Sequence, residues 1–176
     1  MKTTMCNTNA IHKKILDRDT LAIEVQRRQA TGESGVFTNG CFDLLHLGHV
    51  CYLQEARSLG DFLVLGLNSD EGVGLLKGAG RPLVPEDERA KILAALMCVD
   101  YVTIFSEPTA GPLVSVLQPS IYVKGGDYAG SESNIPDADR LPEAKVVQQY
   151  GGLVRLIPYL PHHSTTELIA AIKRLP

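Results

Sequence analysis

Residues 35–67 read GVFTNGCFDLLHLGHVCYLQEARSLGDFLVLGL, and this stretch predicts a strand, a helix and a second strand. The two apolar runs, Gly35–Thr38 and Phe62–Leu67, are rich in Val, Leu and Phe. Runs that are apolar on both faces are typical of parallel strands that helices cover on both sides. Between them, Val50–Leu59 has apolar residues at helical spacing, and we expect it to form the connecting helix.

The same alternation continues toward the C-terminus and indicates the fold class. Three further apolar runs are expected to be strands: Tyr101–Phe105, Ile121–Val123 and Leu153–Ile157. Further helices are expected at Glu86–Val99, Leu113–Leu117, Ala144–Tyr150 and Ser164–Leu175. The alternation predicts a doubly wound, Rossmann-like α/β fold, in which an open five-stranded parallel sheet carries helices on both faces.

The length of 176 residues suits one domain, 1–176, and leaves little room for a second. Residues 1–34 are expected to form a loose tail and one helix, which Asp19 could cap and Gly32 ends. Residues 35–176 would then form the core. Within it, residues 129–142 are rich in Ser, Asp, Pro and Gly, which predicts an extended surface loop.

The composition argues against several classes of protein. A formal net charge of -3 without any Lys/Arg block predicts no nucleic-acid partner. No apolar run approaches the roughly 20 residues of a membrane span, and the polar N-terminus lacks the apolar segment of a signal peptide, so no membrane partner is expected. The 4 cysteines show no Cys-x-x-Cys spacing, which predicts no disulfide framework and fits a cytoplasmic protein.

Polar groups follow four of the five predicted strands. Ligands of open α/β sheets bind beyond the carboxyl ends of the strands, so these groups are expected to converge on one edge. The groups in question are Thr38, Asn39, Gly40, Asp43, His46 and His49 after the first strand, Asn68, Ser69 and Asp70 after the second, Lys124, Gly125, Gly126 and Asp127 after the fourth, and His162, His163, Ser164, Thr165 and Thr166 after the fifth.

The segment His46-Leu47-Gly48-His49 is the sharpest functional signal. Residues three apart share a helix face, so both imidazoles can point at one ligand, and Gly48 permits close approach. Backbone N–H groups at a helix start favour an anion, and imidazoles beside them suit a phosphorus centre that gains negative charge. The alternatives are a structural histidine or a zinc pair, but no convincing set of further zinc ligands lies nearby. We therefore expect His46 and His49 to be catalytic.

Two further segments are expected to contact phosphate. Lys124 ends a buried strand, where a solvated surface charge is hard to explain, and glycines follow it; a simple strand-to-loop turn is the alternative. Residues 164–167, Ser-Thr-Thr-Glu, form a capping box that predicts the start of the last helix. The free N–H groups and hydroxyls of that helix start could hold triphosphate oxygens.

Two basic features leave alternatives open. Residues 72–82 contain Lys77 and Arg81 among glycines, and they match neither a dinucleotide fingerprint nor a P-loop. A mobile basic loop over a substrate phosphate and a plain surface loop both fit. Arg89 lies beside acidic residues in a charged helix turn, where either a solvated ion pair or a ligand contact is expected.

Taken together, these motifs resemble the His-x-Gly-His nucleotidyltransferase superfamily, which includes the phospholipid-precursor cytidylyltransferases. The sequence is more similar to the adenylyltransferase domain of the bacterial heptose 1-phosphate kinase/adenylyltransferases. The resemblance covers about residues 35–172. The matching segments are Phe37–Asp43, His46–His49, Asn68–Asp70, Lys77-Gly78, Gly80–Pro82, Val123–Tyr128, Tyr150–Gly152 and Ser164–Thr166.

The resemblance implies a reaction and assigns roles to the candidate residues. It implies transfer of AMP from ATP to D-glycero-D-manno-heptose 1-phosphate by direct in-line displacement, giving ADP-heptose and pyrophosphate, with Mg²⁺ as cofactor. The catalytic residues would be His46, His49 and Lys124. The nucleotide-binding residues would be Thr38, Asn39, Gly40, Phe42, His46, Gly48, His49, Lys124, Gly125, Asp127, Ser164, Thr165 and Thr166. The acceptor-binding residues would be Asp43, Asn68, Asp70, Lys77, Arg81 and Arg89.

The resemblance also implies partners and leaves competing interpretations. A separate sugar kinase would supply the acceptor, the product would feed lipopolysaccharide core or another surface glycan, and a homodimer or larger assembly is expected. The loop at 129–142 and the pair His162-His163 depart from the family pattern, and these departures concern the acceptor more than the reaction. The alternatives are a cytidylyltransferase acting on glycerol 3-phosphate or a phospho-alcohol, and a nucleotide-binding module without turnover. The presence of both motif histidines and Lys124 disfavours the latter.

Overall fold

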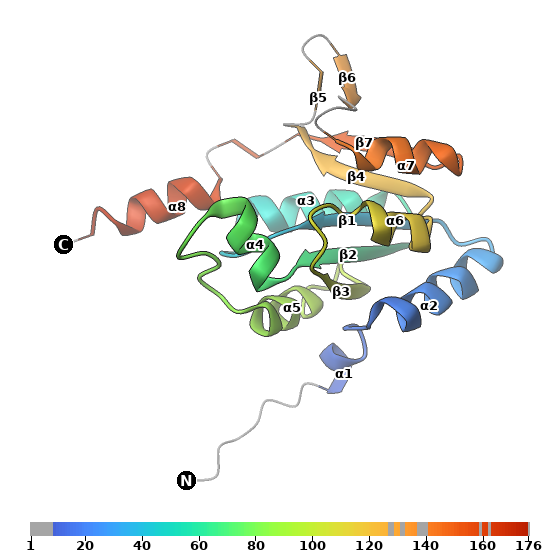
Figure 1. The fold of residues 1–176 in the computed structure, drawn as a ribbon, viewed down its shortest axis with the longest axis horizontal. Coiled ribbons are helices and arrows are strands. Elements are labelled where there is room, and N and C mark those ends of the chain that lie inside the picture. Colours follow the sequence, from blue (N-terminus) through green and yellow to red (C-terminus); the bar gives the residue numbers. More distant parts are fainter. Residues whose placement is uncertain are drawn as a thin grey trace.

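The predicted fold class is confirmed by a computed structural model, which describes residues 9–126, 129–130, 133–136, 141–158, 160–161 and 163–175. A five-stranded sheet with the order β3-β2-β1-β4-β7 forms the centre, and every neighbouring pair of its strands is parallel. Figure 1 shows this sheet between the helices. The strands are β1 (Gly35–Gly40), β2 (Phe62–Asn68), β3 (Tyr101–Phe105), β4 (Ile121–Gly125) and β7 (Leu153–Ile157).

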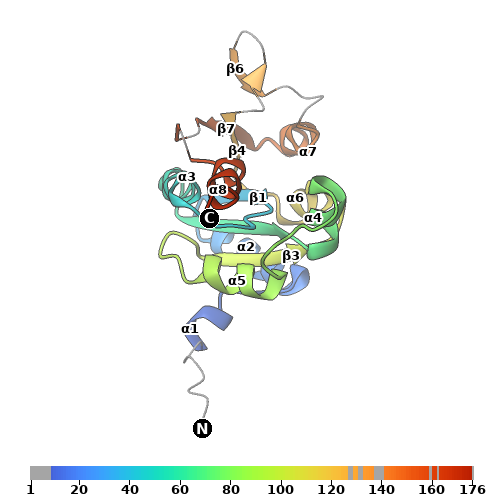
Figure 2. The same cartoon turned by 90° about the vertical axis from the view of Figure 1, so that its left-hand side faces the viewer.

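Helices cover both faces of the sheet, as the apolar strand runs predicted. The helices α2 (Arg18–Ala30), α6 (Gly111–Leu117) and α7 (Glu143–Gln149) pack on one face. The helices α3 (Leu47–Ser58) and α5 (Glu86–Ala94) pack on the other. Figure 2 shows α3 on one side of the sheet and α6 and α7 on the opposite side.

Neighbouring residues of one strand belong to opposite halves of the core. In β1, Phe37 packs with α2, α6 and α7, whereas Val36 packs with α3 and α5. In β2, Val64 and Leu63 divide in the same way. Successive side chains of a strand point to opposite faces, so a sheet covered twice needs apolar residues at consecutive positions. This requirement explains why the strands were recognisable as unbroken apolar runs.

The N-terminal helix was predicted with the wrong cap. The structure caps α2 with Asp17, whose Oδ1 accepts a hydrogen bond from the Thr20 backbone N–H at 2.9 Å. Asp19 lies inside the first turn, where the negative charge of its side chain interacts favourably with the positive end of the helix dipole. The helix ends at Ala30, and Gly32 follows with a φ of 87°. A further short helix, α1 (Asn9–His12), precedes it.

The predicted basic loop at 72–82 is partly helical. The helix α4 (Asp70–Lys77) occupies its first half, and the Ser69 hydroxyl caps it by accepting from the Gly72 N–H at 3.1 Å. Two glycines within the helix lower helix propensity, which is why the sequence pattern suggested a loop. The mobile-loop interpretation therefore applies at most to the residues after Lys77.

Four other expectations change in detail. The helix expected at Val50–Leu59 already begins at Leu47, because His46 occupies the N-cap position, and α5 ends at Ala94 rather than Val99. The last helix, α8, spans Thr165–Ile172. Within the predicted loop at 129–142, β5 (Ala129–Gly130) and β6 (Ser133–Pro136) form an antiparallel pair, which Figure 1 shows projecting beyond β4 and β7.

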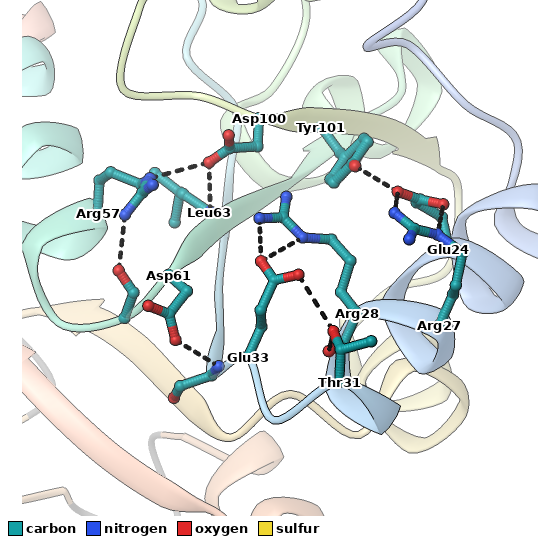
Figure 3. A network of polar contacts seen from close by, with 12 residues as sticks. Glu24, Arg27, Arg28, Thr31, Glu33, Arg57, Asp61, Leu63, Asp100 and Tyr101 are labelled. Atoms are coloured by element: carbon teal, nitrogen blue, oxygen red, sulfur yellow. Dashed lines mark hydrogen bonds and ion pairs between the residues drawn. The ribbon is translucent and has the colours of Figure 1, made fainter.

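A network of charged side chains ties the helices to the amino ends of the strands (Figure 3). Asp100, before β3, accepts a hydrogen bond from the Leu63 N–H at 2.8 Å and pairs with Arg57 of α3 at 2.9 Å. Tyr101 donates a hydrogen bond to Glu24 of α2 at 2.7 Å. These contacts lie at the edge opposite the carboxyl ends, so that end of the sheet is closed by protein contacts.

Among the described helices, none has the length and apolar character needed to cross a membrane.

Candidate active site

A cleft of about 840 Å³ lies at the carboxyl ends of β1, β2 and β4. The chain runs from β1 through β2 to β3 in one direction along the sheet and then returns to β4 and β7 on the other side of β1, so the order reverses between β1 and β4. Ligands of doubly wound sheets bind at such a reversal. The predicted site residues that line the cleft are Asn39, Gly40, Phe42, Asp43, His46, Gly48, His49, Asn68, Lys77, Arg81, Lys124, Gly125, Ser164, Thr165 and Thr166.

The imidazoles of His46 and His49 stack on each other in this cleft. Their ring centroids lie 3.8 Å apart, with an interplanar angle of 29°. The Nδ1 atom of each ring is buried and has no hydrogen-bond partner among the described residues. Burial and the neighbouring His46 lower the pKa of His49 to about 4, and burial also lowers the pKa of His46. Both rings are therefore neutral at pH 7, and each can donate one N–H.

The turn between β1 and α3, which precedes the histidines, has an uncommon backbone conformation at Phe42. Phe42 has a φ of 46°, a left-handed value that is uncommon for a bulky residue, and its ring centroid lies 5.2 Å from that of His49. At Gly48, a Cβ would come within 3.0 Å of both the His46 ring and the Cβ of His163. A larger residue at position 48 would therefore push these side chains apart by a few tenths of an ångström, and glycine avoids that shift.

Lys124 brings a positive charge to the end of β4. Its Nζ donates to the Asn39 carbonyl at 3.1 Å, and the Asn39 side chain accepts from the Tyr122 hydroxyl at 2.8 Å. Burial lowers the pKa of Lys124 to about 8, although the negative charge of Glu143 opposes the shift. The amine remains mostly protonated at neutral pH, so it can attract a phosphate.

The start of α8 closes another side of the cleft. The Ser164 hydroxyl accepts from the Glu167 N–H at 3.1 Å and donates to the Glu167 carboxylate at 2.9 Å, which confirms Ser164 as the cap. Thr165 and Thr166 follow in the first turn and line the cleft. Backbone N–H groups in a first helical turn lack intrahelical partners, so this turn can donate hydrogen bonds to an anion.

Asp43 and Arg81 line the cleft, but they bind each other. The Asp43 carboxylate accepts from Arg81 Nε at 2.6 Å and from the N–H groups of Leu83 and Val84 at 2.7 and 3.0 Å. Burial raises the pKa of Asp43, but these hydrogen bonds outweigh it and hold the pKa below its usual range. The pair thus fixes the segment after α4 against the turn after β1, a role that the sequence did not predict.

Arg89 is neither a solvated ion-pair residue nor part of the cleft wall. It is 1% exposed, and its guanidinium donates to three backbone carbonyls and pairs with a carboxylate. The partners are Cys41 O at 2.7 Å, Val84 O at 2.8 Å, Asn68 O at 2.9 Å and Asp70 Oδ1 at 2.6 Å. The solvated ion-pair interpretation of Arg89 is therefore wrong, whereas the ligand contact stays a prediction. The buried guanidinium ties the ends of β1 and β2 to α4 and α5.

Three other predicted residues also lie apart from the cleft wall or outside the description. Asp70 is the partner of Arg89 at the start of α4. Thr38 is fully buried, and its hydroxyl lies 2.7 Å from the Tyr52 hydroxyl, so it joins β1 to α3, and its predicted contact with the nucleotide stays a prediction. Asp127 lies outside the described residues.

The cleft has a wall that the sequence did not predict. It is formed by residues 108–110, which follow β3, and by residues 141–143, at the start of α7. Glu143 in this wall looks in the sequence like an ordinary acidic residue of a first helical turn. In the described part of the chain, no group of His, Cys, Asp and Glu side chains is large enough to hold a metal ion.

Comparisons with known proteins show the family to which this chain belongs. Residues 37–171 match the family described as cytidylyltransferase-like. The "Bifunctional protein HldE" of Pelobacter propionicus is 51% identical over 90% of this chain, and that of Geotalea uraniireducens is 52% identical over 91%. The chain spans only 31% of the length of each of these relatives.

Two solved structures share the fold. A lipopolysaccharide core biosynthesis protein from Thermoplasma volcanium has a TM-score of 0.57 and 26% identity, covering 75% of this chain and 100% of that one. A pantoate-beta-alanine ligase from Francisella tularensis has the same TM-score of 0.57 at 15% identity, covering 90% of this chain and 76% of its own, and supports the fold alone. With a family match over most of its length, the chain belongs to the cytidylyltransferase-like family of nucleotidyltransferases.

Proposed function

We propose that this chain transfers AMP from ATP to D-glycero-D-manno-heptose 1-phosphate and releases ADP-heptose and pyrophosphate. The observation that carries the proposal is the pair of stacked, neutral imidazoles that line the same cleft as Lys124. The motif resemblance to heptose 1-phosphate adenylyltransferases and the similarity to proteins named HldE support the choice of nucleotide and acceptor.

The proposed reaction is a single displacement at phosphorus. An oxygen of the acceptor phosphate attacks the α-phosphorus of ATP. The bond from that phosphorus to the oxygen bridging toward the β-phosphorus breaks, and pyrophosphate leaves with the electron pair. Negative charge grows on the transferring and leaving oxygens, which is where preorganised donors lower the barrier most.

The chain supplies such donors from three directions. His46 and His49 offer neutral N–H groups from the start of α3, and Lys124 offers a cation from the end of β4. The first turn of α8 offers backbone N–H groups and two threonine hydroxyls. We assign the imidazoles and Lys124 to the α-phosphate and the turn of α8 to the remaining phosphates of ATP.

We propose that Mg²⁺ enters with ATP rather than binding a site built by the protein. Mg²⁺ prefers oxygen ligands and usually keeps substrate phosphates in its shell. Among the described residues, no cluster of acidic, histidine and cysteine side chains could hold a metal. The cleft carboxylate of Asp43 already accepts hydrogen bonds from Arg81, Leu83 and Val84. The reaction consumes a sugar 1-phosphate, so we also propose a functional link to a sugar kinase.

Pyrophosphate release tests the proposal directly. The protein is incubated with Mg²⁺, each of the four nucleoside triphosphates, and either sugar 1-phosphates or glycerol 3-phosphate, and His49→Ala serves as the control for contaminating activity. We expect release with ATP and heptose 1-phosphate and almost none in the control. Release with CTP and glycerol 3-phosphate instead would support a cytidylyltransferase and overturn the proposal.

A further inference from the structure

A buried carboxylate stands in the cleft on the side away from the histidines. Glu143 is the first residue of α7, is only 5% exposed, and lines the cleft. Helix α7 packs on the face of the sheet that also carries α6, whereas α3, with His46 and His49, packs on the other face. The carboxyl end of β4, with Lys124, lies between the two faces.

The protein holds this carboxylate by one oxygen only. Glu143 Oε1 accepts a hydrogen bond from the Ala110 N–H at 2.9 Å, and Ala110 is the N-cap residue of α6. Within the described part of the chain, Oε2 accepts no hydrogen bond. The side chain is 5% exposed and lines the cleft, so a ligand that fills the cleft is the natural source of donors for the second oxygen.

The charge of Glu143 restricts what that ligand can be. A carboxylate repels phosphate, and the cationic and N–H donors of the cleft lie toward Lys124, α3 and α8. The wall around Glu143 is completed by Leu141, Pro142 and Thr109, which carry no charge. This half of the cleft therefore suits the uncharged, hydroxyl-bearing part of an acceptor whose phosphate lies near Lys124.

We propose that Glu143 is the residue that recognises the acceptor's hydroxyl groups, by accepting hydrogen bonds from the sugar through Oε2. This inference rests on the proposed function and names the residue that selects the acceptor. The carboxylate favours a polyhydroxylated acceptor over a phospho-alcohol with few hydroxyls, because the former offers more hydroxyl donors to the second carboxylate oxygen.

The substitution Glu143→Gln isolates this role. Glutamine keeps the shape of the side chain and an oxygen that can accept from the Ala110 N–H, but it removes the charge. A hydrogen bond to a charged group typically contributes enough binding energy for a factor of about ten to one hundred. We expect the KM for the sugar 1-phosphate to rise by about this factor, while the KM for ATP stays within about twofold. Glu88→Gln, at an exposed first-turn glutamate of α5, is the matched control and should change neither.

A second variant separates a hydroxyl contact from a purely electrostatic effect on Lys124. Glu143→Asp keeps the charge but withdraws the carboxylate by one methylene. If Glu143 only keeps Lys124 protonated, this variant should behave like the wild type. If it contacts the sugar, the acceptor KM should rise as it does in Glu143→Gln. Thermal melting of both variants shows whether they fold.

Analogues of the sugar 1-phosphate that each lack one hydroxyl group complete the test. In the wild type, removal of the contacted hydroxyl should raise the acceptor KM about tenfold or more, and in Glu143→Gln the same removal should add little. Equal losses in both proteins, or a Glu143→Gln variant whose KM rises for ATP as much as for the acceptor, would overturn the role of Glu143 alone. A wild type that releases pyrophosphate only with glycerol 3-phosphate or another phospho-alcohol would overturn the proposed function as well.

Discussion

Arg89→Ala should destabilise the protein strongly, although the sequence presents Arg89 as one charge among several on a helix. The guanidinium is buried, and its removal leaves three backbone carbonyls and one carboxylate without their donor. These partners are Cys41, Asn68, Val84 and Asp70. Removing one member of a buried ion pair costs about 3–5 kcal/mol. The Asp70 side chain is 43% exposed and water can solvate it, so we expect the lower part of that range, about 3 kcal/mol.

This cost can be measured as a shift in the unfolding midpoint. For a chain of this length, a change of 1 kcal/mol shifts Tm by about 2–4 °C, so Arg89→Ala should lower Tm by about 6–12 °C. The matched control is Arg27→Ala, which removes an arginine paired with Glu24 at 2.8 Å, but with a side chain that is 63% exposed. The control should melt like the wild type, because exposed ion pairs contribute little.

A conservative variant tests the geometry of the contacts that the Arg89 guanidinium makes. Arg89→Lys keeps the charge, but a single ammonium cannot reproduce the planar set of donors, so it should melt well below the wild type. Refutation would come from an Arg89→Ala protein that melts together with Arg27→Ala. Normal stability combined with a raised KM for the acceptor would restore Arg89 to the substrate-binding residues, against the burial seen here.

The remaining predictions concern the cleft. His46→Ala and His49→Ala should each lower turnover by about 10²–10³, with a smaller effect on ATP affinity, and near-normal pyrophosphate release from both would contradict the catalytic assignment. Burial holds the pKa of folded His49 at about 4, below the ordinary value of 6.5, so the unfolded chain binds more protons between these pH values. Stability should therefore be full above pH 6.5 and fall by up to about 3 kcal/mol as the pH drops toward 4, and His49→Asn should show a flatter dependence in urea titrations. Thr165→Ala and Thr166→Ala should weaken ATP binding by about 1.5–3 kcal/mol each without lowering Tm, and unchanged ATP affinity in calorimetry would remove the phosphate role of α8. Ser164→Ala should cost about 1 kcal/mol, but hydrogen exchange in α8 should report it rather than global melting, because α8 contributes no buried residue.

The strands could be predicted because the physical cause of their pattern is local. A sheet covered on both faces needs consecutive apolar residues, and the range Tyr101–Phe105 has the same ends in sequence and structure. Helix α4 could not be predicted in this way. Its glycines at 72 and 74 resemble a loop, and the cap at Ser69 gains its meaning only once the helix exists. Local propensity was overridden there by packing against the sheet.

Some residues of the candidate site could be predicted from local sequence, and others could not. Residues near the carboxyl end of a strand, such as Lys124 in β4 and His46 in the turn after β1, could be placed at the carboxyl edge from sequence order alone. Glu143 and Ala110 come from helix starts, and their position in the cleft depends on how α6 and α7 pack together. Arg89 could not be recognised as a structural residue either, because no sequence pattern reveals that carbonyls from three separate segments converge on one side chain.

Unsatisfied polar atoms and unusual backbone conformations in the described chain also indicate a ligand site at the β1–α3 turn, independently of any relative. The buried side-chain atoms that lack a hydrogen-bond partner are the Nδ1 atoms of His46 and His49. The left-handed backbone of Gln118 ends a helix, where that conformation is common, but that of Phe42 lies in the turn before the histidines. At the other end of the sheet, Arg57 and Asp100 are paired and hydrogen-bonded. Folded chains keep unsatisfied polar atoms and strained backbone where ligand binding compensates for them. The β1–α3 turn is therefore the position at which binding of a substrate should stabilise the protein most.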